Sequence, residues 1–294
     1  MDREVVILKP GELILKSKGV RKEFEKRLLF NVRDCLKKKE IEFDHIIRGQ
    51  ARYFIYTPES EEVISSIKNV FGISVLFSAA QVGAGLSPIK SAILDLAEEL
   101  DIGPKSSFGI RANVVNNELS SREVETQVGA FIEKKTKAKV NLTKPDHWLR
   151  VEIVRTKAFI YSDAEEGLNG LPLGTGGKVI TLISEKEQDI IAAWMMMMRG
   201  CEIIPIHIRK SESDLAKFQN NVNKLNKFAW GSRIKPLSIK DPKKELKEII
   251  QKTKAKAYVF GNTEVHPREA DMPIFEPLIG LDKKQLKALE KIIS

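Results

Sequence analysis

Hydrophobic residues recur along the chain with two different periods, and the first segment shows both. An apolar run, VVIL, precedes a stretch whose apolar residues fall at helical spacing: Phe24, Leu28, Leu29, Val32 and Leu36. Two short strand-like runs, HII and YFIY, then flank Gly49, where the chain can turn, and a helical pattern follows at 60–72. This strand–helix–strand–strand–helix order predicts a small α+β sandwich.

The next segment repeats a mixed pattern. ISVLFSAAQV predicts a strand, PIKSAILDLAEEL a helix and SFGIRANVV a second strand. SSREVETQVGAFIEKKT begins with serines and carries a nearby Glu, as helix N-termini often do, and strands close the segment. We expect a second α+β domain here.

A glycine-rich stretch, EEGLNGLPLGTGG at 165–177, separates this part from a regular alternation of strands and helices. VITLIS, CEIIPIHI, IKPLSI and AYVFGN read as strands, and amphipathic helical segments lie between them. Strands that alternate with helices predict a parallel α/β sheet.

Length and composition fit a multidomain globular protein. The 294 residues have room for two domains or three small ones, and 42% of them are hydrophobic. No apolar run approaches the ~20 residues that cross a bilayer, and the N-terminus does not resemble a secretory signal. With only two cysteines, we expect a reducing, cytoplasmic location.

The net charge of +9 is unevenly distributed. Residues 1–60 carry +4, residues 61–170 carry −2 and residues 171–294 carry +7. A basic surplus at both ends suits a polyanion such as RNA. A merely soluble, lysine-rich surface explains the charge equally well.

Several motifs, in order, resemble one family. GELILKSKGVRKEFEKRL, FGISVLFSAA, FGIRANVVNNELSSREVETQVGAFI and LRVEI resemble the front half of the tRNA 4-thiouridine synthetases, or tRNA sulfurtransferases. NGLPLGTGGKVITLIS and EPLIGLDKKQL resemble parts of the family's PP-loop ATP-pyrophosphatase domain. The resemblance implies a multidomain α/β and α+β fold with three parts: a ferredoxin-like domain (1–60), a THUMP domain (61–170) and a Rossmann-like PP-loop-type parallel sheet (171–294).

The phosphate loop departs from the family's pattern, SGG-x-D-S. Ser184 keeps the first position and an aspartate, Asp189, closes the six-residue stretch, but Glu185 and Lys186 replace the two glycines. Glycines let the backbone approach the ATP phosphates, and the amides at the following helix N-terminus hold the anion. We therefore expect a degraded ATP loop, a strand-to-helix turn with no ligand. The alternative is a functional site that uses ATP and Mg²⁺.

Sulfur transfer by this chain is not expected either. The family requires a sulfur-carrying cysteine, but Cys201 and Cys35 both read as buried apolar residues and no C-x-x-C occurs. The four histidines, including His207 and His266, have no metal-ligand spacing, so we predict no metal site and assign no catalytic residue.

Candidate RNA contacts come from two segments. Arg111 and Asn113 leave a strand, and Ser121 and Arg122 begin a helix, where amides and an arginine suit a phosphate. The segment after the first strand adds further basic candidates, which a solvated surface explains nearly as well: Lys16, Lys18 and Arg21. The resemblance implies that the THUMP domain contacts the acceptor end of tRNA.

The favoured function is therefore tRNA binding by a relative of the 4-thiouridine synthetases whose ATP site is impaired. Such a protein would present tRNA to a separate sulfur-transfer or tRNA-modifying protein, and the family implies a homodimer. One alternative is an active sulfurtransferase that adenylates a uridine of tRNA. A second is a scaffold subunit that binds no RNA.

Overall fold

A computed structural model describes residues 5–49, 51–209, 212–265 and 270–293. Its contacts divide the chain into two compact units that each combine distant parts of the sequence. One unit consists of Met1–Lys9, Ile41–Ser65 and Val75–Glu166. The other consists of Pro10–Glu40, Ser66–Ser74 and Gly167–Ser294.

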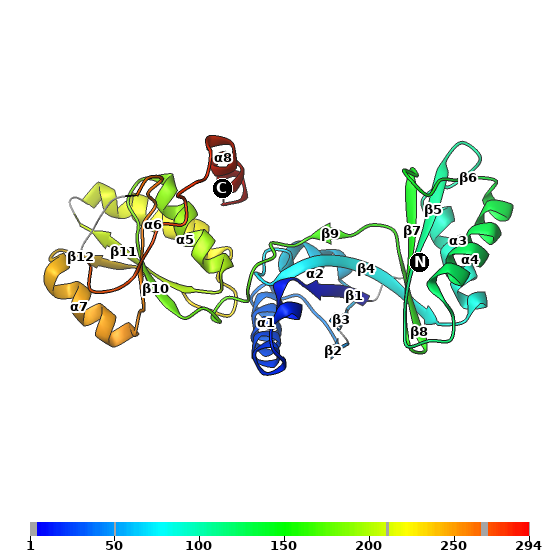
Figure 1. Ribbon diagram of the computed structural model, residues 1–294, viewed down its shortest axis with the longest axis horizontal. Coiled ribbons are helices and arrows are strands. Elements are labelled where there is room, and N and C mark those ends of the chain that lie inside the picture. Colours follow the sequence, from blue (N-terminus) through cyan, green and yellow to red (C-terminus); the bar gives the residue numbers. More distant parts are fainter. Residues whose placement is uncertain (1–4, 50, 210–211, 266–269, 294) are drawn as a thin grey trace. The chain divides into compact units, whose positions relative to one another are not determined.

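The first unit is built on one continuous sheet (Figure 1). In the described part of the chain its strand order is β2-β3-β1-β4-β8-β7-β5-β6, and β9 pairs with β4. The strands are β1 (Val5–Pro10), β2 (His45–Arg48), β3 (Tyr53–Tyr56), β4 (Ile73–Gly83), β5 (Ser107–Val115), β6 (Lys139–Val140), β7 (His147–Val154), β8 (Lys157–Tyr161) and β9 (Glu165–Glu166).

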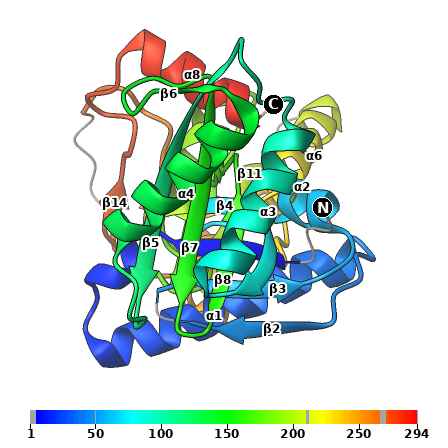
Figure 2. The same ribbon diagram turned by 90° about the vertical axis from the view of Figure 1, so that its right-hand side faces the viewer.

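Two helices, α3 (Leu86–Glu99) and α4 (Ser121–Thr136), lie side by side across β5, β7 and β8 (Figure 2). Alternation along β5 turns Phe108 and Ile110 toward these helices, in a core with Leu149 and Val128. The intervening residues of β5 and β7 lie on the opposite face of the sheet. A short helix, α2 (Ser60–Ile67), follows β3.

A buried charge cluster lies in the same unit. Glu152 of β7 is 2% exposed and accepts hydrogen bonds from Lys9 and Arg52. The Tyr161 hydroxyl donates a third bond at 3.3 Å. Burial, followed by the nearby Glu152 charge, raises the pKa of Tyr161. The carboxylate is therefore compensated from three parts of the chain, as a buried charge requires.

The second unit contains a five-stranded sheet of order β12-β11-β10-β13-β14 in which every pairing is parallel. The strands are β10 (Lys178–Leu182), β11 (Glu202–Ile208), β12 (Leu237–Ile239), β13 (Tyr258–Val259) and β14 (Ile274–Phe275). The helices are α5 (Glu187–Met198), α6 (Glu212–Asn226), α7 (Pro242–Thr253) and α8 (Lys283–Ile293), with α1 (Lys18–Lys38) and a short 3₁₀ helix, η1 (Glu12–Leu15), in the same unit.

Helices α5, α6 and α8 share one core with one face of this sheet, which includes Val179 and Ile203. Met196 and Met197, from the run at 195–198, are buried in this core. Residues of α7 pack instead with Ile180 and Ile204 on the other face. Both faces are thus covered, as a parallel sheet requires, but unequally.

The glycine-rich stretch packs against the turn that follows α5. The amides of Gly174 and Gly176 both donate to the carbonyl of Gly200, each at 2.8 Å. A Cβ on Gly176 would lie 2.9 Å from the Cys201 sulfur, so a larger residue does not fit. The glycines here let the backbone of the glycine-rich stretch approach the turn after α5 closely.

The predicted fold class is confirmed, with an α+β front half and a parallel α/β sheet after residue 177. In these units the first helix groups with the parallel sheet, and the three expected domain ranges stay a prediction. His266 lies outside the described residues. Across the described ranges, no helix is long and apolar enough to span a membrane.

Candidate functional site

The loop between β10 and α5 is closed by its own carboxylate. Asp189, in the first turn of α5, accepts hydrogen bonds from the amide and the hydroxyl of Ser184 at 2.9 and 2.6 Å. The amide of Lys186 donates to the Ser184 hydroxyl at 3.1 Å. These hydrogen bonds join the end of β10 to the first turn of α5.

The surroundings of this loop are rich in acidic side chains. A cavity of about 350 Å³ lies at the carboxyl ends of β10 and β11. It is lined by Leu182, Ile183, Ser184, Glu185, Asp189, Ile206, His207, Ile208, Asp214, Phe260 and Asn262. Glu185 forms an exposed ion pair with Lys217 at 3.0 Å, and this hydrogen bond raises the pKa of Lys217.

Gly261 allows the segment after β13 to approach this loop. A Cβ at Gly261 would lie 2.5 Å from the carbonyl carbon of Gln188 and 2.6 Å from the amide of Asp189. His207 is 7% exposed and stacks on Phe218, with ring centroids 5.1 Å apart. Its Nε2 has no hydrogen-bond partner in the described part of the chain, so this buried histidine is incompletely satisfied.

The other candidate region is the helix-free face of β5 and β7, the face opposite α3 and α4 within the described residues. The parallel register pairs Gly109 with Trp148 and Arg111 with Arg150. The Arg111 guanidinium lies 4.6 Å from the centre of the Trp148 ring, and the Arg150 guanidinium lies 5.8 Å from it. Two cations thus stack on one indole, which a cation–π interaction favours.

Glycine and a carbonyl fix this cluster in place. A Cβ on Gly109 would lie 2.6 Å from the Trp148 ring, so the ring packs directly on the glycine backbone. Nη2 of Arg111 donates to the carbonyl of Leu142 at 3.1 Å. Sequence reasoning missed Trp148 and Arg150, although their alternation in HWLRVEI places them on the same face as Arg111.

The remaining candidates are distributed between the two units. Asn113 is exposed on β5, and Arg122 is exposed in the first turn of α4. Ser120, rather than Ser121, caps this helix by accepting the amide of Glu123 at 3.1 Å. The basic residues near the N-terminus belong to the other compact unit, at the start of α1: Lys16, Lys18 and Arg21.

Neither cysteine has the environment of a reactive thiol. Burial raises the pKa of Cys35 to about 12, and burial also raises the pKa of Cys201. Within the described residues, no group of three or more His, Cys, Asp or Glu side chains is arranged to hold a metal ion.

Family comparisons agree with this architecture. Three models match in order: the ThiI ferredoxin-like domain at residues 5–76, the THUMP domain at 84–163 and the thiamine biosynthesis protein (ThiI) at 174–260. A ferredoxin-like domain, a THUMP domain and a PP-loop-type sheet define the class of THUMP-containing tRNA-modification proteins.

The chain belongs to the tRNA sulfurtransferase (ThiI) family. It is 31% identical to a probable tRNA sulfurtransferase of Thermococcus kodakarensis, over 98% of this chain and 87% of that protein. It is also 31% identical to one from a Thermoanaerobacter species, over 99% and 86%. The first alignment runs over 333 positions, more than the 294 residues here, so that relative contains segments that this chain lacks.

Two solved structures share the fold. PH1313 from Pyrococcus horikoshii is 28% identical with a TM-score of 0.86, over 98% of this chain and 99% of that one. A 4-thiouridine synthetase, solved in complex with RNA and ATP, has a TM-score of 0.81 at 24% identity, over 99% and 84%. The predicted family is therefore confirmed.

Proposed function

We propose that this protein binds tRNA, chiefly through residues 61–170, and does not itself adenylate the RNA. The observation that carries the proposal is the helix-free face of β5 and β7, where Arg111 and Arg150 stack on Trp148. Guanidinium groups donate to phosphate oxygens, and an adjoining aromatic ring offers a surface for unstacked bases. Membership in a family of tRNA sulfurtransferases makes tRNA the natural polyanion.

The phosphate loop does not fit ATP. Side chains stand at Glu185 and Lys186, where two glycines would admit the phosphates. The amide of Ser184 is already hydrogen-bonded to Asp189. Carboxylates line the cavity beside it, and these repel the phosphates of a polyanion. We infer that the chain keeps the fold of the ATP-binding domain but not its ATP-dependent activity.

A separate protein would then modify the bound tRNA, since both cysteines of this chain are buried and have raised pKa values. We propose that this chain presents the acceptor end of tRNA to a sulfur-transfer or other modifying enzyme in the cytoplasm. A homodimer and three domains, with boundaries near residues 60 and 170, complete the proposed organisation.

The test is a gel-shift titration of the full chain with total tRNA at increasing salt. Affinity should fall steeply with salt, because each neutralised phosphate releases counterions. Arg122→Ala should weaken binding about tenfold if the guanidinium contacts a phosphate. Lys105→Ala, a matched loss of one positive charge in the same unit, should change it little. Absence of any shift would favour the scaffold alternative.

A further inference from the structure

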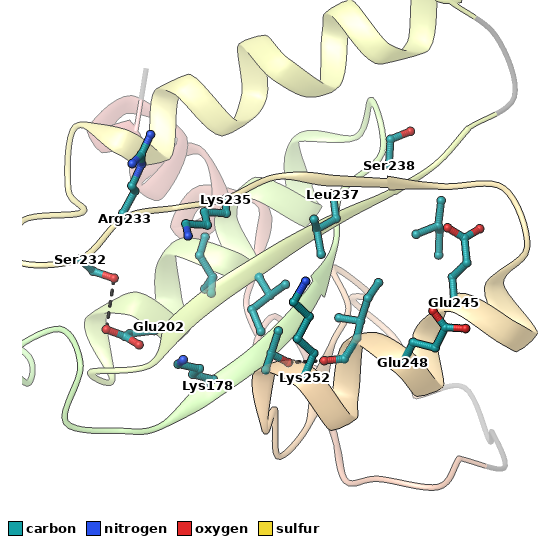
Figure 3. A pocket seen from close by; sticks show the side chains of 15 residues that line it. Lys178, Glu202, Ser232, Arg233, Lys235, Leu237, Ser238, Glu245, Glu248 and Lys252 are labelled. Atoms are coloured by element: carbon teal, nitrogen blue, oxygen red, sulfur yellow. Dashed lines mark hydrogen bonds between the residues drawn. The ribbon is translucent and has the colours of Figure 1, made fainter.

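A second cavity, of about 600 Å³, lies in the unit with the parallel sheet, on the face that α7 covers (Figure 3). It is at the opposite end of the strands from Ser184, since Lys178 begins β10 and Glu202 begins β11. The lining residues come from the starts of these two strands, from β12 with the segment that precedes it, and from α7. The size falls within the range of small-molecule sites.

The cavity follows from the unequal cover of the sheet. Three helices pack on one face, whereas α7 is the helix that packs on the other within the described residues. Its floor is apolar: Ile204 is buried, and Leu237 and Ile249 pack against the same core. An apolar ligand bound here would cover these branched side chains and remove them from water.

Positive charge gathers over this apolar floor. Lys178, Lys235 and Lys252 line the cavity together with Arg233 (Figure 3). None of these four side chains forms an ion pair or hydrogen bond with another residue of the described ranges. The four cations come from β10, from the segment before β12 and from α7, so they surround the cavity instead of following one helix face.

Two of the three carboxylates that line the cavity are already engaged. Glu202 is 3.2 Å from Nη2 of Arg27 and accepts the Ser232 hydroxyl at 3.2 Å. Glu245 accepts the amides of Lys240 and Asp241, each at 2.8 Å, and these hydrogen bonds lower its pKa. Glu202 and Glu245 therefore already have other partners, whereas Glu248 is the uncommitted carboxylate among the described lining residues, so the four cations outnumber the carboxylates.

We propose that this cavity binds a nucleoside phosphate. The phosphate contacts Lys178, Lys235 and Lys252, and the nucleoside lies on the apolar floor. Lysine ammonium groups bind phosphate as point charges. A free nucleotide and one nucleotide of a single-stranded RNA present the same chemistry. The site is separate from the RNA surface on β5 and β7, and the inference does not depend on that proposal.

Titration calorimetry on the full chain tests the proposal with three probes: ADP, adenosine and pyrophosphate. ADP should bind with a saturable isotherm. Adenosine lacks the anion and pyrophosphate lacks the apolar body, so each should bind at least about tenfold more weakly. Absence of ADP binding up to about 1 mM, the weak limit of small-ligand affinity, would overturn the proposal.

Variants locate the site. Lys235→Gln and Lys252→Gln should each weaken ADP binding about tenfold, the loss of one charge-assisted contact. Lys247→Gln removes the same charge from an α7 residue outside the cavity and should leave affinity unchanged. Leu237→Trp fills the floor without altering charge and should also abolish binding, with folding checked by circular dichroism. Equal affinity in Lys235→Gln, Lys252→Gln and the control would overturn the assignment.

A tetra-adenylate oligonucleotide distinguishes the two sources of the ligand. If RNA is the source, the oligonucleotide should compete with ADP, and Lys252→Gln should weaken binding of both. If the source is a free nucleotide, ADP should bind and the oligonucleotide should not compete. A failure of tRNA binding that spares ADP binding would count against the RNA surface alone.

Discussion

Nε of Arg27, in the first helix of the chain, donates a 2.7 Å hydrogen bond to the carbonyl of Leu173. The same guanidinium contacts the carbonyl of Gly231 at 2.8 Å. Asn31, one helical turn later, donates to the Leu173 carbonyl at 3.1 Å. These bonds tie α1 to the segment that leads into the parallel sheet.

Arg27→Ala should destabilise this unit by about 2 kcal/mol, because it leaves two partly buried carbonyls without their charged donor. Urea unfolding followed by tryptophan fluorescence measures the change. Lys26→Ala, at an exposed neighbouring position, is the matched control and should be nearly neutral. Equal midpoints for the two variants would contradict the role assigned to Arg27.

Glu152→Gln should destabilise the protein by about 3 kcal/mol. The change leaves the cations of Lys9 and Arg52 facing a neutral amide in a buried site, and breaking a buried pair costs more than the pair contributes. Chemical unfolding of the full chain provides the measurement, and Glu166→Gln on an exposed strand is the control. A loss no larger than that of the control would show that the cluster is solvated.

Both cysteines should resist alkylation by N-ethylmaleimide at pH 8 until the chain unfolds. Burial raises the pKa of Cys35 from 9.0 to about 12 and raises that of Cys201, so the reactive thiolate is suppressed. The Cys35 contribution to stability is complete below pH 9.0 and is lost as the pH rises toward 12. Mass spectrometry after timed labelling measures the rate of alkylation. Rapid modification of Cys201 in the native protein would support a sulfur-carrier role for that residue.

Arg111→Ala should weaken tRNA binding by about 1–3 kcal/mol and lower the slope of affinity against salt by about one. The side chain is exposed on the helix-free face and already oriented by Trp148 and the Leu142 carbonyl. Filter binding at several salt concentrations gives both quantities. An unaltered slope would mean that Arg111 contacts no phosphate.

The purified chain should not release AMP and pyrophosphate from ATP in the presence of Mg²⁺ and unmodified tRNA. The amide of Ser184 is hydrogen-bonded to Asp189 and the loop lacks the two glycines that would admit the leaving pyrophosphate, and donors to such a group contribute on the order of 100–1000-fold each to rate. Incubation with labelled ATP, with denatured protein as the control, measures the release of AMP and pyrophosphate. Turnover that Asp189→Ala abolishes would show instead that the loop is active.

The sequence predicted the order and type of the elements well. The apolar run VITLI and the helical spacing that includes Leu28 and Leu36 each reflect which positions of one short segment are buried. It predicted Arg111 from a family motif but not Trp148, whose role depends on the pairing of β5 with β7 across 39 residues. The second cavity was also missed, since Lys178, Lys235 and Lys252 converge only when α7 packs on the sheet.

The bonds of α1 have a consequence for how the protein is made. Arg27 and Asn31 leave the ribosome early, but their acceptors at Leu173 and Gly231 are synthesised more than 140 residues later. The helix must therefore wait for most of the chain before its packing is complete, and such long-range closure slows folding. A nascent chain that stalls after the THUMP domain would lack the acceptors of Arg27 and Asn31, so the packing of α1 would be incomplete, and incompletely packed apolar surface is what chaperones bind.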